Sequence, residues 1–141
     1  MQSLPERLKS FYEACSEQRE HALEHLPDLF ATDVHFRDPF RETQDIAALH
    51  ELFVRMFKQY KLVAFSGFRI DGDEEAFTMT YLMHLKMAFG PTFTTPMASV
   101  VRSRDGKIID LLDYYDFPSG LVSPLPAFAA GYRKLITRFF L

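Results

Sequence analysis

Leu29–Phe40 reads LFATDVHFRDPF, a short segment in which apolar and polar side chains alternate. The alternation predicts a strand over 33–39 rather than a helix, and Pro39 ends it because proline cannot donate to a sheet. One face of this strand is apolar except for a single carboxylate: Val34, Phe36, Asp38 and Phe40. A carboxylate desolvated among Phe rings has a raised pKa and can act as a general base near neutral pH.

Helical patterns lie on both sides of this strand. Ser3 and Glu6 have the spacing of a capping box, and an apolar stripe follows at helical spacing: Leu4, Leu8, Phe11, Tyr12 and Cys15. A second helix is expected over 17–31, kinked or restarted at Pro27 because the proline ring blocks a hydrogen bond one turn back. A third is expected after 43–45, with its own apolar stripe: Ile46, Leu49, Phe53, Met56, Phe57 and Tyr60.

The second half of the chain is typical of antiparallel strands, predicted over 62–70, 77–87, 92–103 and 108–115. Helices followed by a meander of strands indicate an α+β fold, with the helices laid on one face of a curved sheet. A Pro-rich connection over 117–126 then leads to a tail, 127–141, in which recurring apolar residues predict a final amphipathic helix.

Composition narrows the class of protein. The 141 residues fit one domain, with a core expected over about 3–117. The formal net charge of −3 argues against a nucleic-acid surface, and 15 Phe with 6 Tyr suggest a wide core or a lined cavity. The single cysteine, Cys15, excludes an internal disulfide. With no membrane-length apolar run and no signal peptide, we expect a cytoplasmic protein without a membrane partner.

Two further stretches complete a family pattern: RSRDGKII over 102–109 and DYYD over 113–116. With Leu29–Phe40 and the order of elements, they resemble the nuclear transport factor 2-like superfamily, which includes ketosteroid isomerase, limonene epoxide hydrolase and SnoaL-like polyketide cyclases. The resemblance implies a cone-shaped, mainly antiparallel sheet wrapped around the N-terminal helices, a cystatin-like roll that encloses an apolar pocket. It also implies a homodimer formed through the outer face of the sheet.

The resemblance to ketosteroid isomerase assigns proton abstraction to Asp38 and an oxyanion-binding hydroxyl to Tyr12. From the residues alone, Asp38 is equally a turn residue before Pro39, and Tyr12 a core residue. The resemblance also places a protonated Asp of that enzyme at Ser99, so a hydroxyl replaces the second acid here. Ser99 remains a candidate substrate-binding residue, but steroid isomerisation by that mechanism is not expected.

Asp113 and Tyr115 share one face of the last predicted strand with two apolar residues, Ile109 and Leu111. Asp113 is either a pocket acid or a structural carboxylate. In limonene epoxide hydrolase the matching acid works with an Arg-x-Asp pair, which the resemblance places at Thr80 and Leu82. Neither residue can activate water, so epoxide hydrolysis is not expected.

The remaining candidates concern binding. Phe36 and Phe53 are candidate apolar walls of the pocket. His84 is a candidate substrate-binding residue because histidine titrates near neutrality, although its face of strand 77–87 equally suits an exposed sheet back or a subunit interface. His21 and His25 match the H-x-x-E-H pattern of some zinc peptidases, but no third ligand follows at a suitable spacing, so we expect no metal or cofactor.

Two functions remain open at this stage. The first is a cofactor-independent isomerase, cyclase or dehydratase acting on a small apolar carbonyl compound, with Asp38 as base, Asp113 as second acid and Tyr12 or Tyr115 as hydrogen-bond donor. The second is a non-catalytic module that binds a hydrophobic ligand or mediates dimerisation.

Overall fold

A computed structural model describes residues 1–140 of the chain. An N-terminal helical layer consists of α1 (Leu4–Gln18), the 3₁₀ helix η1 (Arg19–His25), α2 (Leu26–Leu29) and, further along the chain, α3 (Ile46–Gln59). The capping box is present: the Ser3 hydroxyl accepts from the Glu6 amide, and the Glu6 side chain accepts from the Ser3 amide. Asp45 caps α3 by accepting from the Ala48 amide at 2.7 Å.

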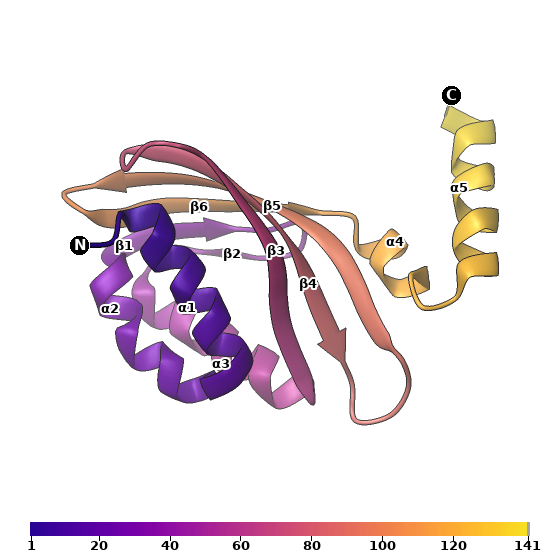
Figure 1. The fold of residues 1–141 in the computed structure, drawn as a ribbon, viewed down its shortest axis with the longest axis horizontal. Helices are drawn as coiled ribbons and strands as arrows, with labels where there is room; N and C mark the ends of the chain where they lie inside the picture. Colours follow the sequence, from indigo (N-terminus) through magenta and orange to yellow (C-terminus); the bar gives the residue numbers. More distant parts are fainter. Residues whose placement is uncertain (141) are drawn as a thin grey trace.

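The helices cover one face of a curved, unclosed, six-stranded sheet with the order β2-β1-β6-β5-β4-β3 (Figure 1). The strands are β1 (Phe30–Arg37), β2 (Glu42–Thr43), β3 (Leu62–Gly72), β4 (Ala76–Lys86), β5 (Thr92–Arg104) and β6 (Lys107–Tyr115). β1 runs parallel to β6 and all other neighbours are antiparallel, so the sheet is mixed. The predicted α+β class is confirmed.

The helix expected over 17–31 is wrong in its extent. Arg19 has a φ of 47°, where α1 ends, and the chain continues as η1 and then as α2, which has Pro27 in its first turn. The Arg19 guanidinium donates to the carbonyls of Phe57 and Tyr60 at 3.1 and 3.2 Å. These hydrogen bonds hold the chain in place where α1 ends and η1 begins. Phe30 pairs with Ile108 of β6, so it starts β1. Tertiary pairing outweighs local helical periodicity here.

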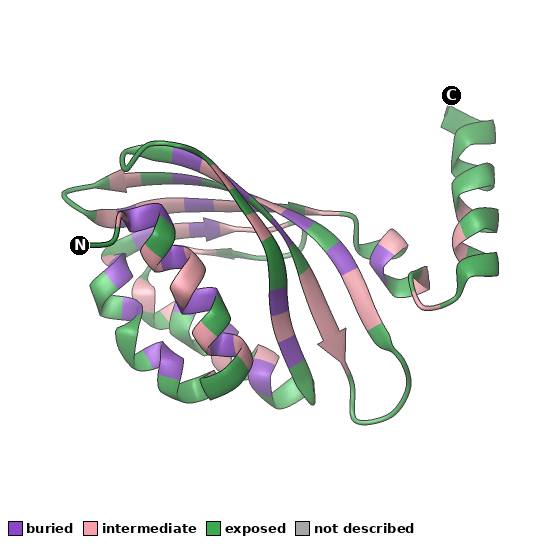
Figure 2. Ribbon diagram, viewed as in Figure 1, coloured by how far each residue is buried: buried purple, intermediate pink, exposed green. Residues whose placement is uncertain are grey.

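The core lies between the helices and the inner face of the sheet (Figure 2). On β4 the inner face carries Phe77, Met79 and Tyr81, all buried, so the apolar side of the strictly alternating strand points toward the helices. Burial of this continuous apolar surface is the main stabilising contribution to the fold.

Two helices follow the sheet: α4 (Phe117–Val122) and α5 (Pro126–Phe140). Asp116 caps α4 by accepting from the Ser119 amide at 3.1 Å. α4 packs on β5, where Gly120 lies so close to Thr95 that a Cβ on it would approach the Thr95 Cβ to 2.9 Å. The predicted tail helix is present as α5, and the last residue of the predicted tail, Leu141, lies outside the described residues.

Candidate active site

A cavity of about 480 Å³ lies between α1, α3 and the inner face of the sheet. Most of its wall is aromatic or thioether, and a few polar groups converge on it: Tyr12, Asp38, Arg41, Tyr81, Asp113 and Tyr115. Phe36 and Phe53 also line it, in the positions expected for apolar walls. Apolar cavities with a few placed polar groups are typical of small-molecule sites.

Asp113 is the carboxyl group of this cavity whose pKa is shifted from its ordinary value. It lies on β6 directly opposite Ser99 of β5, and only 8% of its surface is exposed. The Ser99 hydroxyl donates to Asp113 Oδ1 at 2.5 Å. Desolvation raises the pKa of Asp113 to about 7, although the hydrogen bond from Ser99 opposes this rise. A carboxyl with this pKa can both accept and donate a proton near neutral pH.

The Tyr81 hydroxyl is hydrogen-bonded to the Ser99 hydroxyl, on the side of Ser99 away from Asp113. The Tyr81 and Ser99 oxygens lie 2.9 Å apart. Ser99 has one proton and gives it to Asp113, so Tyr81 is the donor to Ser99. The result is a directed chain of hydrogen bonds from Tyr81 through Ser99 to Asp113.

Tyr12 joins this cluster through its ring. The ring centroids of Tyr12 and Tyr81 are 5.3 Å apart, and Phe65 lies 4.9 Å from Tyr12. Burial, together with the nearby Tyr81 and Asp113, raises the pKa of Tyr12 well above its ordinary value. The phenol therefore stays protonated and can donate a hydrogen bond to an oxygen in the cavity. Tyr12 is thus a buried core residue that also lines the cavity.

Asp38 differs from the expected free base. Its side chain is only 1% exposed, and the amides of Phe40 and Arg41 donate to Oδ1 at 2.8 and 2.7 Å. The Arg41 guanidinium donates to Oδ2 through Nε at 2.9 Å and Nη2 at 2.6 Å, and the Tyr115 hydroxyl lies 3.4 Å away. Both carboxylate oxygens are occupied by donors. Asp38 is thus the turn residue of the alternative interpretation, and it also holds an ion pair at the cavity.

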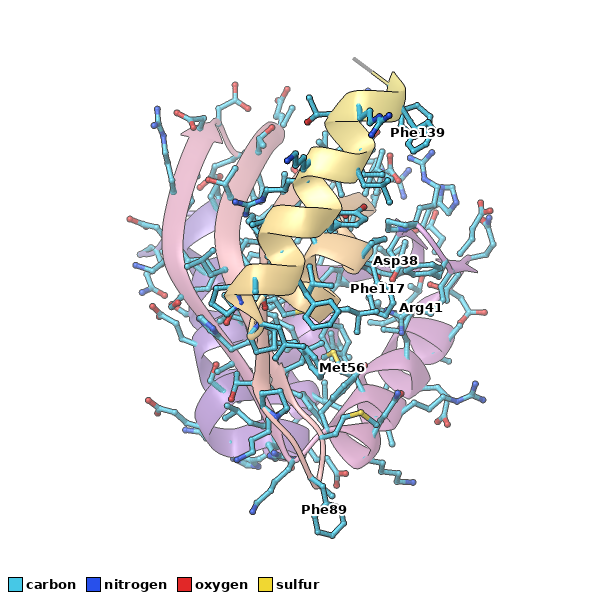
Figure 3. The ribbon with its side chains drawn as sticks, turned by 90° about the vertical axis from the view of Figure 1, so that its right-hand side faces the viewer. Asp38, Arg41, Met56, Phe89, Phe117 and Phe139 are labelled. Atoms are coloured by element: carbon cyan, nitrogen blue, oxygen red, sulfur yellow. The ribbon has the colours of Figure 1, made fainter. Side chains whose placement is uncertain are left out.

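Asp38 and Arg41 line the cavity together with Met56 and Phe117, and Figure 3 shows all four on the side of the molecule that faces the viewer. Phe40 packs edge-on against Phe117 at 5.2 Å between centroids. Desolvation, reinforced by the charge of Asp38, raises the pKa of Tyr115 to about 12, so this phenol is also a donor rather than a base.

Ser99 and His84 lie outside the cavity lining. Ser99 is fully buried behind Asp113, so it positions that acid instead of touching a ligand. His84 lies on the opposite face of β4, where it is hydrogen-bonded to Ser66 at 2.8 Å and Thr94 at 2.9 Å. The prediction of His84 as a pocket residue is therefore wrong, because strand alternation directs its side chain to the outer face.

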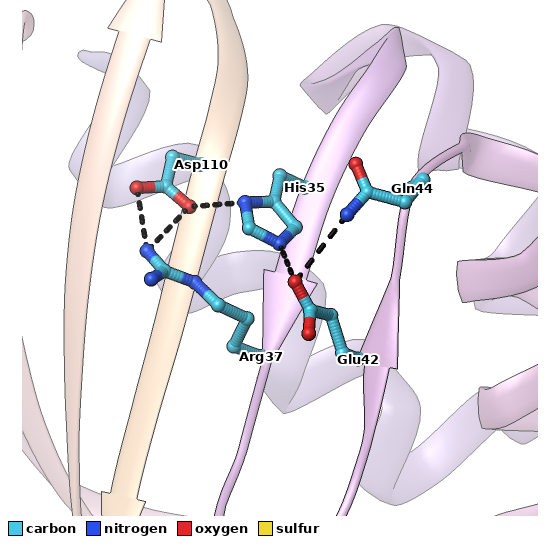
Figure 4. Close-up of polar contacts among 5 residues, drawn as sticks. All are labelled: His35, Arg37, Glu42, Gln44 and Asp110. Carbon is cyan, nitrogen blue, oxygen red and sulfur yellow. Dashed lines mark hydrogen bonds and ion pairs between the residues drawn. The ribbon is translucent and has the colours of Figure 1, made fainter.

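Another polar cluster lies on the outer face of the sheet (Figure 4). His35 contacts Glu42 through Nε2 at 2.6 Å and Asp110 through Nδ1 at 3.6 Å, and Arg37 pairs with Asp110 at 3.0 Å. These polar contacts link β2, β1 and β6 on the side away from the cavity. The Asp110 side chain is partly covered by these partners and is 27% exposed.

Sequence reasoning missed Tyr81 and Arg41. Tyr81 is not among the predicted site residues, although alternation on β4 and β5 places its side chain on the same face of the sheet as Ser99. Arg41 follows Asp38 by three residues in a turn, a spacing that allows the ion pair. Within residues 1–140 no group of three or more His, Cys, Asp or Glu could hold a metal ion, and no helix there is long and apolar enough to cross a membrane.

The sequence profile of the SnoaL-like domain matches residues 8–111, well over half of the chain. The chain belongs to the SnoaL-like domain family. The match spans α1 to β6, and so includes Tyr12, Asp38 and Ser99 but ends before Asp113. No curated protein matches this SnoaL-like chain.

Solved structures share this fold at low sequence identity. A protein of ketosteroid isomerase-like fold from Catenulispora acidiphila DSM 44928, solved with trimethylamine, has a TM-score of 0.71 and 20% identity, covering 84% of this chain and 91% of its own. A proposed polyketide cyclase from Xanthomonas campestris has a TM-score of 0.69 and 20% identity, covering 82% and 91%. An epoxide hydrolase of the limonene type from M. tuberculosis has a TM-score of 0.66 and 18% identity. That match covers 88% of this chain and 96% of the epoxide hydrolase. At these identities the comparison establishes the fold alone.

Proposed function

We propose that this SnoaL-like protein is a cofactor-independent enzyme of the isomerase, cyclase or lyase type, acting on a small, largely apolar carbonyl compound. The observation that carries the proposal is Asp113, a buried carboxyl with a pKa of about 7 that opens onto an apolar cavity. The family comparisons support the fold on which this chemistry occurs, but they do not identify the substrate.

The chemistry begins with a proton transfer. The ionised Asp113 carboxylate takes a proton from the carbon next to the substrate carbonyl, and the electron pair of that C–H bond moves toward the carbonyl oxygen. Tyr12 or Tyr115, both protonated, donates a hydrogen bond to the developing enolate oxygen. Asp113 then returns the proton to the same or another carbon, so atoms and electrons balance without a cofactor.

The magnitudes suit this assignment. A positioned base contributes on the order of 10²–10⁴-fold to a rate, and one oxyanion donor about 10²–10³-fold. Asp113 replaces Asp38 as the base because the Asp38 oxygens already accept from two amides and a guanidinium. Asp38 instead holds Arg41 at the cavity wall.

Exchange of substrate protons tests the proposal. The protein is incubated with a panel of ketones in D₂O, and loss of the α-proton signal is followed by NMR. Wild type should catalyse exchange for at least one compound that fits the cavity, and Asp113→Asn should reduce the rate at least ~100-fold. Asp110→Asn, on the outer face of the same strand, is the matched control and should retain the rate.

A ligand-binding module is the second candidate, favoured by the fact that Asp38, Arg41, Ser99 and Tyr81 are already hydrogen-bonded to one another or to neighbours. A compound from the panel that binds in the cavity, while wild type and Asp113→Asn show equal exchange, would support this second function and contradict the first.

A further inference from the structure

α5 exposes an apolar stripe that no other described residue covers. Its large side chains recur three or four positions apart on one face: Phe128, Tyr132, Leu135 and Phe139. Phe128, Leu135 and Phe139 are 69%, 53% and 72% exposed, and no residue from Pro126 to Phe140 is buried. The helix runs across one end of the molecule and packs mainly against α4 (Figures 1 and 2). A helix of about 15 residues is marginal in water unless its apolar face packs on another surface.

Two other segments add exposed apolar residues at the same end. The turn between β4 and β5 carries Met87 and Phe89, which are 45% and 92% exposed. Leu121 of α4 and Leu125, just before α5, are 44% and 50% exposed. Figure 3 shows Phe89 and Phe139 on the side of the molecule that faces the viewer. Segments far apart in the sequence thus form one surface, which we call the apolar end; a contiguous exposed apolar surface marks an interaction site.

The charges at the apolar end are basic. Counted along the helix, Arg133 lies on one side of the apolar stripe, and Lys134 and Arg138 lie on the other. Residues 86–104 and 117–141 contain no Asp or Glu. Without the three basic residues of α5, 13 basic and 19 acidic residues leave the rest of the chain at −6. The charge of the molecule is therefore strongly asymmetric, with a cationic apolar end.

We infer that the apolar end docks on an anionic lipid surface, with α5 lying in the interface between headgroups and acyl chains. Interfacial helices carry aromatic and aliphatic residues on one face and Lys or Arg on the other, as α5 does. Each basic residue near an anionic leaflet strengthens binding. No membrane-length apolar run is needed, because such a helix lies on the bilayer and does not cross it. This inference replaces the sequence-based expectation of no membrane partner.

A lipid surface fits the apolar end better than a second copy of the chain does. Two copies meeting through this same surface would bring together two helices that carry only basic charges, and like charges disfavour such contacts. The acidic remainder of the chain does not prevent docking. The turn between β3 and β4 has four acids within 71–75 and lies at the opposite end of the molecule from α5 (Figure 1). At physiological ionic strength, charges are screened over about 8 Å.

Docking would also bring one side of the cavity wall to the bilayer. Met56 and Phe117 line the cavity, and Figure 3 shows them on the same side of the molecule as Phe89 and Phe139. Apolar compounds leave water for the bilayer, so an apolar ligand would be concentrated on that side. The docking itself does not depend on the proposed chemistry, because neither Asp113 nor a hydrogen-bond donor of the cavity takes part in it.

Flotation of the full-length chain with vesicles tests the role of charge. Vesicles of phosphatidylcholine and phosphatidylserine in equal parts should bind wild type at least ~10-fold more tightly than vesicles of pure phosphatidylcholine. Arg133→Gln with Lys134→Gln should weaken binding to the anionic vesicles roughly 30-fold. Lys9→Gln with Arg69→Gln is the matched control. It removes the same charge from exposed positions outside the apolar end and should change binding by less than ~3-fold.

The same assay tests the apolar residues. Phe89→Gln changes a side chain that is 92% exposed in a turn, so the fold is retained, yet binding to the anionic vesicles should fall at least ~5-fold. Leu135→Gln with Phe139→Gln should weaken it at least ~30-fold. Leu82→Gln with Val100→Gln is the control, at positions 38% and 40% exposed on the outer face of the sheet, and it should leave binding unchanged.

Fluorescence measures insertion directly, because the chain contains no Trp. On the anionic vesicles, the emission of Phe89→Trp should move to shorter wavelength and should be quenched by lipids with brominated acyl chains. Tyr114→Trp, at a position 56% exposed on the outer face of the sheet, should show neither change.

Three results would overturn the inference. The first is a wild type that floats no better with the anionic vesicles than with pure phosphatidylcholine. The second is an emission of Phe89→Trp that the anionic vesicles do not change. The third is an oligomer that forms without lipid, does not float, and is lost with Leu135→Gln and Phe139→Gln, since α5 would then dock on a second copy of the chain.

Discussion

The Ser99 hydroxyl donates to Asp113 Oδ1 at 2.5 Å, from the strand directly opposite and from a fully buried position. This hydrogen bond favours the ionised carboxylate, whereas desolvation favours the neutral acid. These two effects are the largest, and together with the charges of Asp38, which raises the pKa, and Arg41, which lowers it, they place the pKa of Asp113 at about 7. Tyr81, which donates to Ser99, fixes the direction of the Ser99 hydroxyl.

Removing the Ser99 hydroxyl should therefore raise the pKa of Asp113 further. A hydrogen bond to a charged group contributes about 1.5–3 kcal/mol, so Ser99→Ala should shift this pKa upward by roughly 1–2 units. In the pH profile of proton exchange, the limb that reports ionisation of the base should move to higher pH by that amount. Ser66→Ala, on the outer face, is the control, and equal profiles for wild type and Ser99→Ala would contradict the role of Ser99.

Asp113 should also make the stability of the protein depend on pH. Its folded pKa of about 7 lies above the ordinary 3.8, so the native state binds more protons than the unfolded state between these values. The contribution of the group to stability is complete below about pH 4 and is lost as the pH rises to about 7.

Asp113→Asn removes the free-energy cost of ionising a buried carboxyl above about pH 4. Relative to wild type, its free energy of unfolding should gain roughly 2–4 kcal/mol between pH 4 and pH 7.5. Urea unfolding at several pH values measures the difference in free energy of unfolding between Asp113→Asn and wild type. The contributions of the other carboxylates are the same in both proteins and cancel in this difference. A constant difference over this range would show that Asp113 titrates normally.

The Asp38–Arg41 ion pair at the cavity wall should be required for stability. Arg41→Ala would leave the Asp38 carboxylate, 1% exposed, without its cation. The expected loss is roughly 2–3 kcal/mol, less than for a fully buried pair because the Arg41 side chain is 47% exposed. Arg55→Ala, which breaks a pair on the surface of α3, should change stability by less than ~0.5 kcal/mol. Equal effects in urea unfolding would contradict this difference.

Gly120 should be necessary for the packing of α4 on β5. A Cβ at this position would come within 2.9 Å of the Thr95 Cβ, a distance that requires α4 or β5 to shift. Gly120→Ala should destabilise the protein by about 1–3 kcal/mol, as overpacking commonly does. Because Phe117 begins α4 and lines the cavity, ligand affinity should also fall. Unchanged thermal unfolding would contradict tight packing at this position.

Much of the fold was predictable because alternation and helical spacing are local signals. The strictly alternating strand 77–87 and the stripe on α3 appear as expected. The region 17–31 was not predictable in the same way, since pairing of Phe30 with β6 depends on residues about 80 positions away. α4 was missed because Pro118 and Gly120 are typical of a connection, although Asp116 and the contact with Thr95 stabilise a helix.

The site was predictable in its residues more than in their roles. Asp113, Tyr12 and Tyr115 meet at the cavity, because alternation along a strand and spacing along a helix determine which way they point. Which carboxyl stays unpaired depends on partners that follow in a turn or lie on another strand. The Arg41 guanidinium forms an ion pair with Asp38, whereas the hydrogen bond to Asp113 comes from the neutral hydroxyl of Ser99. The sequence of one strand cannot show this difference.

The ionisation of Asp113 is the claim on which the proposed chemistry depends. Carbonyl-detected ¹³C NMR of the aspartate side chains, recorded as a function of pH, measures it directly, with Asp113→Asn identifying the signal. An Asp113 carboxyl that titrates near pH 7 is the predicted result. A midpoint near the ordinary value of 3.8 would mean that the carboxyl is well solvated and cannot serve as the proposed base.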